Sequence, residues 1–582
     1  MRERLVLLAL LLCSGPAWAS TVVEEEEEEP SVPGYLEVQA QSINLSEDVL
    51  RISVSNGVLR PSRGYAPLDV TLHNTGSTPR VVRIDLESHG AGRSGSATRV
   101  VEVGPRQRLV AWVPFSVTSR GGSVRVRGQD IPPNSFNFYT VNPPGSPVLV
   151  LGVEAQFETG TGLPRVQKDP KLSVRFLPPQ DAPRELSAYV GHTAVVVASE
   201  VAALPADVWA SLEAYAATGG SLSLLVPPRD VGQRLPLLDN TSPGEHPYGF
   251  GRVRLCAEAK GCGAGLLADA SRTEADTEAG KVVGLLSPIG PPPTWQQRGG
   301  YLLHDGAEPL LPGVQAPVGR FLLLITLFVL LVGPGGLALA RRKGPVALLI
   351  AVPSVALVTC LAIIGYSVLV EGFSVHAARY SITLLDRARD RALIAGLNGY
   401  YANLEPDGAR VPTLGALLGP DSDWDPHGLE ADWTNGMVVT GGFLPSRTYR
   451  EWGELAVVPT RARLTLRREG QTLRVQNALG ARLAEGSVRL EGEEWVLPVL
   501  EDGAEGEASP APSSRKEFLE VVGFSEAVRR RFSGVPWDTL SAPLPEKGFR
   551  ARLEGPGLAP TSALPVELHE GLHFVLGRVD GP

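Results

Sequence analysis

The sequence predicts a multidomain protein that joins all-β and mixed α/β domains to a pair of transmembrane helices. Residues 35–145 and 371–582 contain short segments in which apolar and polar residues alternate, which is the pattern of half-buried strands. Residues 146–317 open with a continuous apolar run, typical of a parallel strand buried on both faces. Residues 321–340 and 345–370 carry no charged side chain and are long enough to cross a bilayer as helices.

Length and composition set the number of units and exclude one class of partner. At 582 residues the chain is too long for a single domain with one hydrophobic core, because domains usually hold about 100–200 residues. The net charge is −9, and the lysines and arginines are scattered, so no nucleic-acid partner is expected. The expected boundaries are 1–19 for a signal peptide, 20–34 for an acidic disordered tether, 35–145 for a β-sandwich, 146–317 for an α/β domain, 318–340 and 345–370 for transmembrane helices, 341–344 for the loop between them, and 371–582 for a β-rich exported domain.

The N-terminus has the three parts of a secretory signal. Arg2 and Arg4 precede an apolar stretch over 5–12, and Ala17 and Ala19 stand where signal peptidase requires small residues. Cleavage after Ala19 is expected, so the chain that follows is exported.

The two apolar segments predict a membrane hairpin of defined orientation. The short connection between them holds Arg341, Arg342 and Lys343, and short basic loops stay in the cytoplasm. Both large regions are therefore expected outside the cytoplasm, in a protein of the inner (plasma) membrane whose first partner is the lipid bilayer. The glycine- and proline-rich run 333–336 predicts either a site where a partner helix approaches closely or a frayed helix end.

The region before residue 145 predicts a β-sandwich. Alternating segments cover 68–72, 81–86, 108–115 and 123–127, with turn-forming residues between them. The string 69–76 resembles the strand-and-turn pattern of exported immunoglobulin-like modules.

The region from residue 146 predicts alternating strands and helices. Strands are expected at 148–153, 172–177, 193–199 and 221–226, and a helix at 205–217 that ends before Gly219 and Gly220. The string 189–226 resembles the class I glutamine-amidotransferase-like domains of some bacterial envelope proteins, over roughly 146–310. In active members a nucleophilic cysteine follows a strand at a sharp turn, but here Val226 precedes Pro227 and Pro228, so the resemblance implies the fold without that activity.

The order of the expected domains resembles that of bacterial membrane proteins of the same kind. Their architecture combines a β-sandwich, an amidotransferase-like domain, a membrane hairpin and a β-rich tail. Some of these proteins resemble companions of ABC transporter systems, which implies a membrane protein partner. Within the tail, strands are expected at 463–466, 472–476, 487–490, 494–500 and 568–579, a polar loop at 501–514, and a short helix at 516–522 or 525–532.

Two cysteines stand close together in the α/β region. Cys256 and Cys262 are the only pair outside the apolar runs, and a disulfide between them would contribute roughly 2 kcal/mol in an exported domain. The alternative is two free thiols. A zinc site is disfavoured because no histidine or second cysteine pair lies nearby.

Other candidate ligands form weaker patterns. Asp421, Asp423 and Asp425 alternate, and Asp432 stands where a closing calcium ligand would be. Pro426 occupies the position that an EF-hand loop gives to glycine, which favours a solvated acidic loop. Four histidines have no carboxylate or cysteine neighbour at ligand spacing in the sequence and are expected in core or surface roles: His192, His304, His376 and His573.

Four aromatic residues are expected either in a β core or on a binding face: Trp424, Trp433, Trp452 and Tyr449.

The favoured functional hypothesis is a non-enzymatic, membrane-anchored periplasmic scaffold or ligand-binding protein. A membrane or periplasmic protein is the expected partner, and no cofactor is expected. The alternative is an exported hydrolase or amidase built from dispersed Asp, Glu, Ser and His residues. A nucleophile–base pair in a pocket of the α/β domain would separate the two hypotheses.

Overall fold

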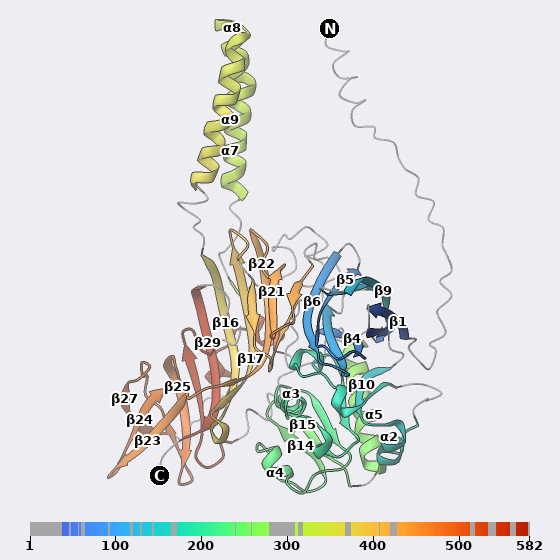
Figure 1. The fold of residues 1–582 in the computed structure, drawn as a ribbon. Coiled ribbons are helices and arrows are strands. Elements are labelled where there is room, and N and C mark those ends of the chain that lie inside the picture. Colours follow the sequence, from blue (N-terminus) through green and yellow to red (C-terminus); the bar gives the residue numbers. More distant parts are fainter. Residues whose placement is uncertain are drawn as a thin grey trace. The chain divides into compact units, whose positions relative to one another are not determined.

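A computed structural model of the chain combines large β-sheets, mixed α/β structure and two long apolar helices (Figure 1). It describes residues 38–579 except 46–47, 56, 60–63, 91–92, 117–119, 129–130, 143–144, 165–170, 239, 258, 279–308, 312–317, 367–373, 407, 420–427, 512–517, 533–539, 541–542 and 559–565. The predicted signal peptide and tether lie outside the described residues.

The first region forms two largely antiparallel sheets, in which β3 pairs in parallel with β9. One sheet has the order β1 (Val38–Leu45), β2 (Asp48–Ser55), β4 (Tyr65–Asn74) and β7 (Arg108–Ser116). The second contains β6 (Arg93–Val103), β5 (Arg80–Gly90), β8 (Gly121–Gly128), β9 (Ile131–Val141) and β3 (Gly57–Leu59). The alternation seen in the sequence places Leu68, Val70 and Leu72 of β4 inward, where each is fully buried. The apolar side chains of the two sheets share one core.

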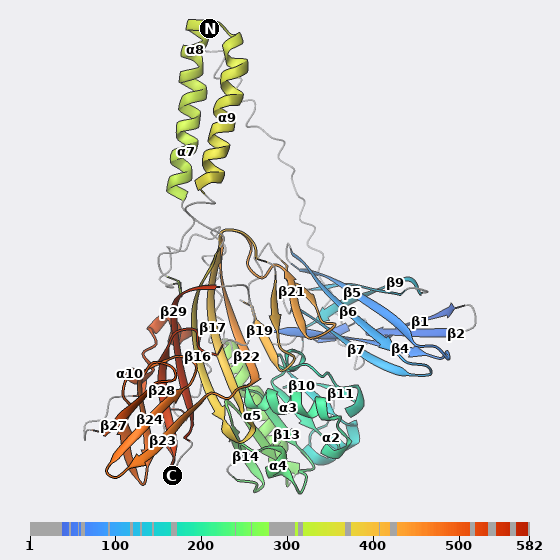
Figure 2. The same cartoon turned by 60° about the vertical axis from the view of Figure 1, so that its left-hand side comes forward.

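Strands from beyond the hairpin complete the second sheet. Its order continues outward from β6 through β20 (Glu430–Asp432), β21 (Met437–Gly441) and β18 (Ala409–Val411), and Figure 2 shows β21 near β5 and β6. Strand β20 runs parallel to β6, with Ala431 opposite Ala97. These strands cover the edge that β6 would otherwise expose, an edge that proteins commonly protect against pairing with other chains.

The α/β region is built on one six-stranded sheet. Its order is β11 (Leu172–Leu177), β10 (Ser146–Leu151), β12 (Ala194–Val197), β13 (Ser221–Leu224), β15 (Gly251–Leu255) and β14 (Gly244–Tyr248), with only β14 antiparallel to its neighbour. Every residue of β10, β12 and β13 is buried, as expected for parallel strands covered on both faces. The helices include α2 (Glu154–Thr161), α3 (Ala206–Ala217) and α5 (Ala259–Glu278). The expected strands and the helix at 205–217 are thus present.

The two apolar segments are helical. The first comprises α7 (Val318–Leu330), a π-helical turn at Leu331–Gly335 and α8 (Gly336–Lys343), and the second is α9 (Val346–Tyr366). Both are long and apolar enough to cross a membrane, and only 6% and 0% of their most apolar windows are buried, so neither resembles the core helix of a soluble domain.

The end of the first helix differs from the expectation. Arg341, Arg342 and Lys343 form the last turn of α8 rather than a loop, where their charges interact favourably with the helix dipole. The helix is not frayed at 333–336, where Pro334 lies inside the π-helical turn. Instead, Gly336 is buried, and a Cβ atom there would lie 3.2 Å from Leu348 Cδ2 of α9, so this glycine lets the two helices of the hairpin approach each other.

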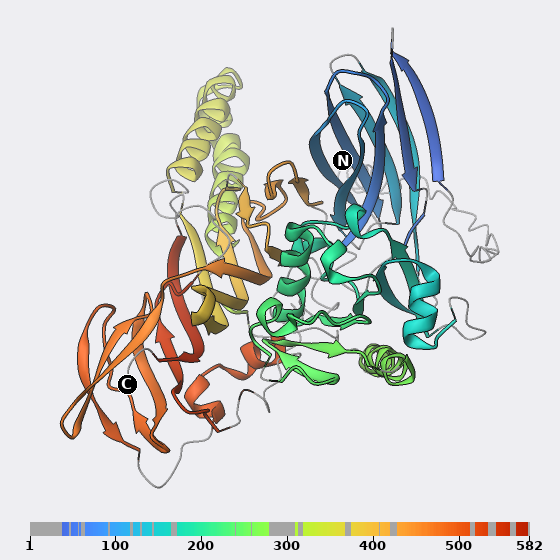
Figure 3. The ribbon, with the colours of Figure 1, turned by 60° about the horizontal axis from the view of Figure 1, so that its bottom comes forward.

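The other strands that the structure describes in the tail form one sheet of 11 strands. The order is β19 (Gly415–Leu418), β22 (Thr448–Pro459), β17 (Arg391–Ala402), β16 (Val375–Asp386), β29 (Val566–Arg578), β28 (Gly548–Glu554), β25 (Arg482–Leu490), β26 (Glu493–Val496), β27 (Glu505–Pro510), β24 (Thr472–Ala478) and β23 (Arg463–Glu469). Near the middle, the C-terminal strand β29, red in Figure 3, pairs in parallel with β16 and antiparallel with β28.

Two details of the tail depart from the sequence expectation. Residues 501–514 were expected as a polar loop, but β27 forms there because it pairs with β24 and β26. Both candidate helices are present, as α10 (Phe518–Val522) and α11 (Glu526–Arg531).

Candidate functional site

The carboxyl edge of the α/β sheet is the place where an open parallel sheet usually binds ligands. In this chain that edge is closely packed at the strands that would hold an amidotransferase nucleophile. A Cβ atom at Gly160 of α2 would lie 2.6 Å from Leu225 Cδ1, and one at Gly152 would lie 2.9 Å from Ala198 Cβ. Small residues therefore let α2 approach the strand ends closely.

The histidines of this domain do not form a nucleophile–base pair within the part of the chain that the structure describes. His192 Nδ1 faces the Tyr189 carbonyl at 3.4 Å, and His246 Nε2 faces the Ser242 carbonyl at 2.7 Å. Burial and the positive charge of Arg175 together lower the pKa of His192 to about 4, against the opposing effect of the bond to the Tyr189 carbonyl. His304 lies outside the described residues.

A cavity of about 440 Å³ lies farther along the same edge, at the carboxyl end of β15, beside β14 and the start of α5. Its walls include Glu245, Arg254, Gly265 and the disulfide between Cys256 and Cys262, whose Cα atoms are 5.7 Å apart. Cys256 directly follows β15, and Cys262 is buried in α5, so the disulfide fixes the start of this helix to the sheet.

The polar wall of the cavity is a charged network around Arg254. This guanidinium lies 3.3 Å from Asp269 Oδ2 and 3.2 Å from Ser223 Oγ, and it also contacts the Glu245 carboxylate. Asp269 accepts a further bond from Ser221 Oγ at 2.9 Å and is fully buried. A Cβ atom at Gly265 would lie 2.3 Å from Arg254 Nε, so α5 crosses the guanidinium only because residue 265 is glycine.

The charges of this network compensate one another. The charge of Arg254 is already balanced by Asp269 and Glu245, which removes the cost of burying an unpaired cation. The Glu245 side chain is 38% exposed, so this side of the Arg254 network faces solvent.

Most of the predicted calcium ligands cannot be placed. Asp421, Asp423 and Asp425 lie outside the described residues, and the calcium site stays a prediction. Asp432, the fourth candidate, ends β20, and its Oδ1 atom accepts a bond from the Thr434 backbone N–H at 2.8 Å.

The aromatic candidates belong to the core where the structure describes them. Trp433 and Trp452 are 1% and 3% exposed, and the Trp452 ring stacks on Phe443 with centroids 5.5 Å apart. Trp424 lies outside the described residues.

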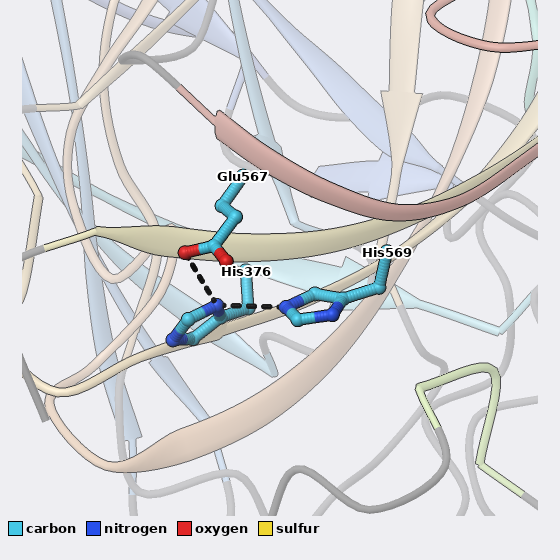
Figure 4. A group of neighbouring side chains, drawn as sticks. All are labelled: His376, Glu567 and His569. Atoms are coloured by element: carbon cyan, nitrogen blue, oxygen red, sulfur yellow. Dashed lines mark hydrogen bonds and ion pairs between the residues drawn. The ribbon is translucent and has the colours of Figure 1, made fainter.

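A cluster of two histidines and one glutamate forms across strands β16 and β29 (Figure 4). His376 lies opposite Glu567 in the parallel pairing, and His569 is the extra residue of a bulge in β29. His376 Nδ1 lies 2.9 Å from His569 Nε2 and 3.4 Å from Glu567 Oε2. Burial lowers the pKa of His376; Glu567 opposes that shift and His569 adds to it.

The sequence places no carboxylate or cysteine near His376 at ligand spacing, but the structure brings Glu567 and His569 beside it. Its partners follow 191 and 193 residues later, a separation that local spacing does not reveal. One signal was available, because Glu567 and His569 alternate within a strand and so share one face. In contrast, His573 is 3% exposed, contacts Ser381 Oγ at 2.8 Å and the Gly555 carbonyl at 3.0 Å, and has the expected core role.

Comparisons with known proteins identify no family. No family model and no curated protein matches the chain. Among solved structures, a β-glucosidase from Listeria innocua in complex with laminaribiose is 13% identical over 22% of this chain and 20% of its own length, with a TM-score of 0.13. A Paenibacillus cycloisomaltooligosaccharide glucanotransferase is 10% identical over 24% of this chain and 18% of its own, with a TM-score of 0.13. A β-glucuronidase from Bacteroides uniformis is 9% identical over 32% of this chain and 24% of its own, with a TM-score of 0.12.

The matched segments thus span about a fifth of those proteins. At these TM-scores the likeness carries no argument about fold or activity.

Proposed function

We propose that this chain is a membrane-anchored, exported scaffold that binds a ligand or a partner protein. One observation carries the proposal: strands encoded before and after the hairpin form a single sheet, through the pairing of β6 with β20. A sheet shared in this way builds one body from both flanks of a short membrane anchor. Such a body is suited to holding other molecules at a fixed place near the membrane.

Several buried contacts reinforce the seam between the two flanks. Tyr65 Oη donates a bond to the Leu417 carbonyl, and the Leu186 backbone N–H donates to the Thr413 carbonyl at 3.1 Å. Arg391 of β17 forms a bidentate pair with Glu213 of α3, at 2.6 and 2.7 Å. Bidentate pairs fix orientation as well as distance, so the seam favours one rigid arrangement.

The shared sheet also supports the proposed topology. Because 38–311 and 374–579 contribute to one hydrophobic core, both must lie on the same side of the membrane, and a hairpin with two spans meets that condition. The basic turn of Arg341, Arg342 and Lys343 then lies on the other side, which the positive-inside rule assigns to the cytoplasm.

The binding function rests on the cavity beside Arg254 and on the resemblance to amidotransferase-like envelope proteins. The cavity offers a buried guanidinium to an anionic group, while the strand ends beside α2, on the same edge of the sheet, are closely packed. The resemblance suggests a membrane protein partner, such as a transporter component.

A paired-cysteine experiment tests the shared sheet and the compartment together. Ala97→Cys and Ala431→Cys, in a Cys360→Ala background, place two thiols at register partners of β6 and β20. We expect a disulfide to form in intact cells without added oxidant, because the exported compartment is oxidising. The matched control pairs Ala97→Cys with Glu430→Cys, whose exposed side chain points to the other face. Failure of the first pair to oxidise, or equal oxidation of both, would contradict the shared exported sheet.

Protease digestion of spheroplasts tests the topology and the partner. Epitope tags after residue 34 and at the C-terminus are both expected to be digested from outside, and mild detergent is expected to recover a second membrane protein with this chain. Protection of the C-terminal tag would contradict the hairpin topology, and recovery of this chain alone would contradict the partner-binding role.

A further inference from the structure

We propose that His376, Glu567 and His569 form a binding site for a divalent first-row transition metal ion, with zinc the best match. Each residue offers one ligand atom, and the three atoms lie within 4.8 Å of one another. Two imidazole nitrogens and one carboxylate oxygen make up a ligand set that zinc sites with an open position commonly use.

The distances suit a metal ion between the three groups. With metal–ligand bonds of about 2.0–2.2 Å, two ligand atoms of a tetrahedral zinc ion lie roughly 3.2–3.6 Å apart. The separations from His376 Nδ1 are 2.9 Å to His569 Nε2 and 3.4 Å to Glu567 Oε2. Glu567 and His569 are exposed, so their side chains are the ones that would adjust to bring all three atoms onto one ion.

The hydrogen-bonding pattern at His376 supports a cation there. One nitrogen, Nδ1, faces both an imidazole nitrogen and a carboxylate oxygen, and Figure 4 shows the two contacts converging on it. A single proton on Nδ1 points at one of these acceptors and leaves the other contact weaker. A metal ion accepts electron pairs from all three groups at once, so it satisfies the whole cluster.

The surroundings hold the ligands in position. The His376 ring stacks on Tyr401 with centroids 6.4 Å apart and planes 24° apart, and Ser374 Oγ donates to Glu567 Oε2 at 3.2 Å. The bulge in β29 brings His569 alongside His376. Contacts of this kind around the ligands orient them and commonly raise metal affinity.

The exposure of the ligand side chains indicates a metal site with an open position for a further ligand. The His376 side chain is 18% exposed and that of Glu567 is 58% exposed, so solvent reaches the ion directly. With three protein ligands, a zinc ion keeps a fourth position for water or for a group on a bound molecule, unlike a closed structural site. The site therefore takes an exchangeable fourth ligand.

Metal titration of the whole protein tests the proposal. Full-length protein carrying a non-histidine affinity tag is purified in detergent, stripped with a chelator and titrated with Zn²⁺ by calorimetry. We expect one ion per chain. His569→Gln should weaken zinc binding by at least about 10-fold. Loss of a residue that only supports a metal ligand typically lowers metal affinity 10–100-fold, so loss of a direct ligand is expected to cost at least as much. His89→Gln, at an exposed histidine of β5, is the matched control and should bind as the wild type does.

A spectroscopic readout separates ligation from a structural effect. Cu²⁺ at one equivalent should give electron paramagnetic resonance splitting from two nitrogen ligands in the wild type and one in His569→Gln. Because His569 is exposed, this variant is expected to keep the urea midpoint of the metal-free wild type. The proposal is overturned if the wild type binds no zinc at millimolar concentration, or if His569→Gln and Glu567→Gln bind it with unchanged affinity.

Discussion

At the scale of single residues, buried charges depend on partners that lie far away in sequence. Arg391 is 11% exposed and Glu213 is 4% exposed, and Arg391 Nε also bonds Asp386 at 2.7 Å. Burial alone would lower the pKa of Arg391, but the bonds and charges of Glu213 and Asp386 outweigh it and raise the pKa. These charges are stable in the core only as a set.

Arg391→Met is therefore expected to destabilise the protein strongly. It leaves Glu213 buried without its cation, and loss of one partner of a buried pair typically costs about 3–5 kcal/mol. Urea unfolding of the full-length protein in detergent, followed by tryptophan fluorescence, measures the loss. The double variant Arg391→Met, Glu213→Gln should recover part of it, and additive losses would argue against a direct pairing.

His573 is expected to make stability fall in acid. Burial lowers its folded-state pKa to about 4, with Arg379 adding to the effect and the Gly555 carbonyl opposing it. Since the unfolded pKa is about 6.5, the unfolded chain binds the proton more readily, so this contribution is fully present above about pH 6.5 and is lost as pH falls toward 4. It amounts to about 3 kcal/mol at most.

The measurement is the urea midpoint between pH 7.5 and pH 4. His573→Gln should flatten this profile relative to the wild type, even if its midpoint is lower at every pH. His89→Gln, at an exposed position, is the control that should leave the slope unchanged.

At the scale of elements, the local spacing of apolar residues was sufficient to predict a strand or helix that has one apolar face. The sequence predicted β4, β5 and α3 because apolar residues in each segment repeat with the period of a strand or a helix. Leu68, Ile84 and Val208 are examples of these apolar residues, and all three are buried. The polar strand β27 was missed because it forms through pairing with β24 and β26, and the sequence Glu-Gly-Glu-Ala-Ser-Pro carries no strand signal.

The candidate sites also differ in how far the sequence could predict them, because some join residues that are close in sequence and others join residues that are far apart. Cys256 and Cys262 lie close in sequence, so their pairing could be anticipated. His376 meets Glu567 and His569 only because β29 enters the sheet beside β16, and that order of strands is a property of the whole sheet.

Removal of the disulfide is expected to loosen the start of α5. The double variant Cys256→Ser, Cys262→Ser opens a loop with a sequence separation of 6, which costs about 2 kcal/mol on the chain-entropy account. Hydrogen exchange of the α5 amides should quicken relative to those of β13. Cys360→Ser alone, at the exposed free cysteine, should change neither, and unchanged α5 exchange in the double variant would show that the bond is dispensable.

The close approach in the hairpin gives a further prediction. Gly336→Leu forces a side chain against Leu348, and overpacking of this kind usually costs about 1–3 kcal/mol. Titration with sodium dodecyl sulfate, followed by circular dichroism, should show earlier unfolding of this variant. Gly365→Leu is the matched control, because a Cβ atom there meets nothing within 4 Å. Equal effects of both would contradict the packing.

At the scale of the whole molecule, the C-terminal strand joins two parts of the large sheet. β29 lies between β16 and β28, with 10 and seven residue pairs respectively. Deletion of residues 566–582 is expected to separate these parts and to make 374–554 sensitive to limited proteolysis. Deletion of 580–582 alone is the control, and protease resistance of the longer deletion would mean that β16 and β28 hold together without β29.

The two paired strands β6 and β20 are synthesised at widely separated times. Ser96 and Glu430 are register partners, but the ribosome must add more than 300 residues between them. At about 5–20 residues per second, the interval is on the order of tens of seconds. Throughout it, the β6 edge that β20 later covers stays unpaired in each newly made chain, so correct assembly depends on keeping neighbouring nascent chains from supplying the missing strand to each other.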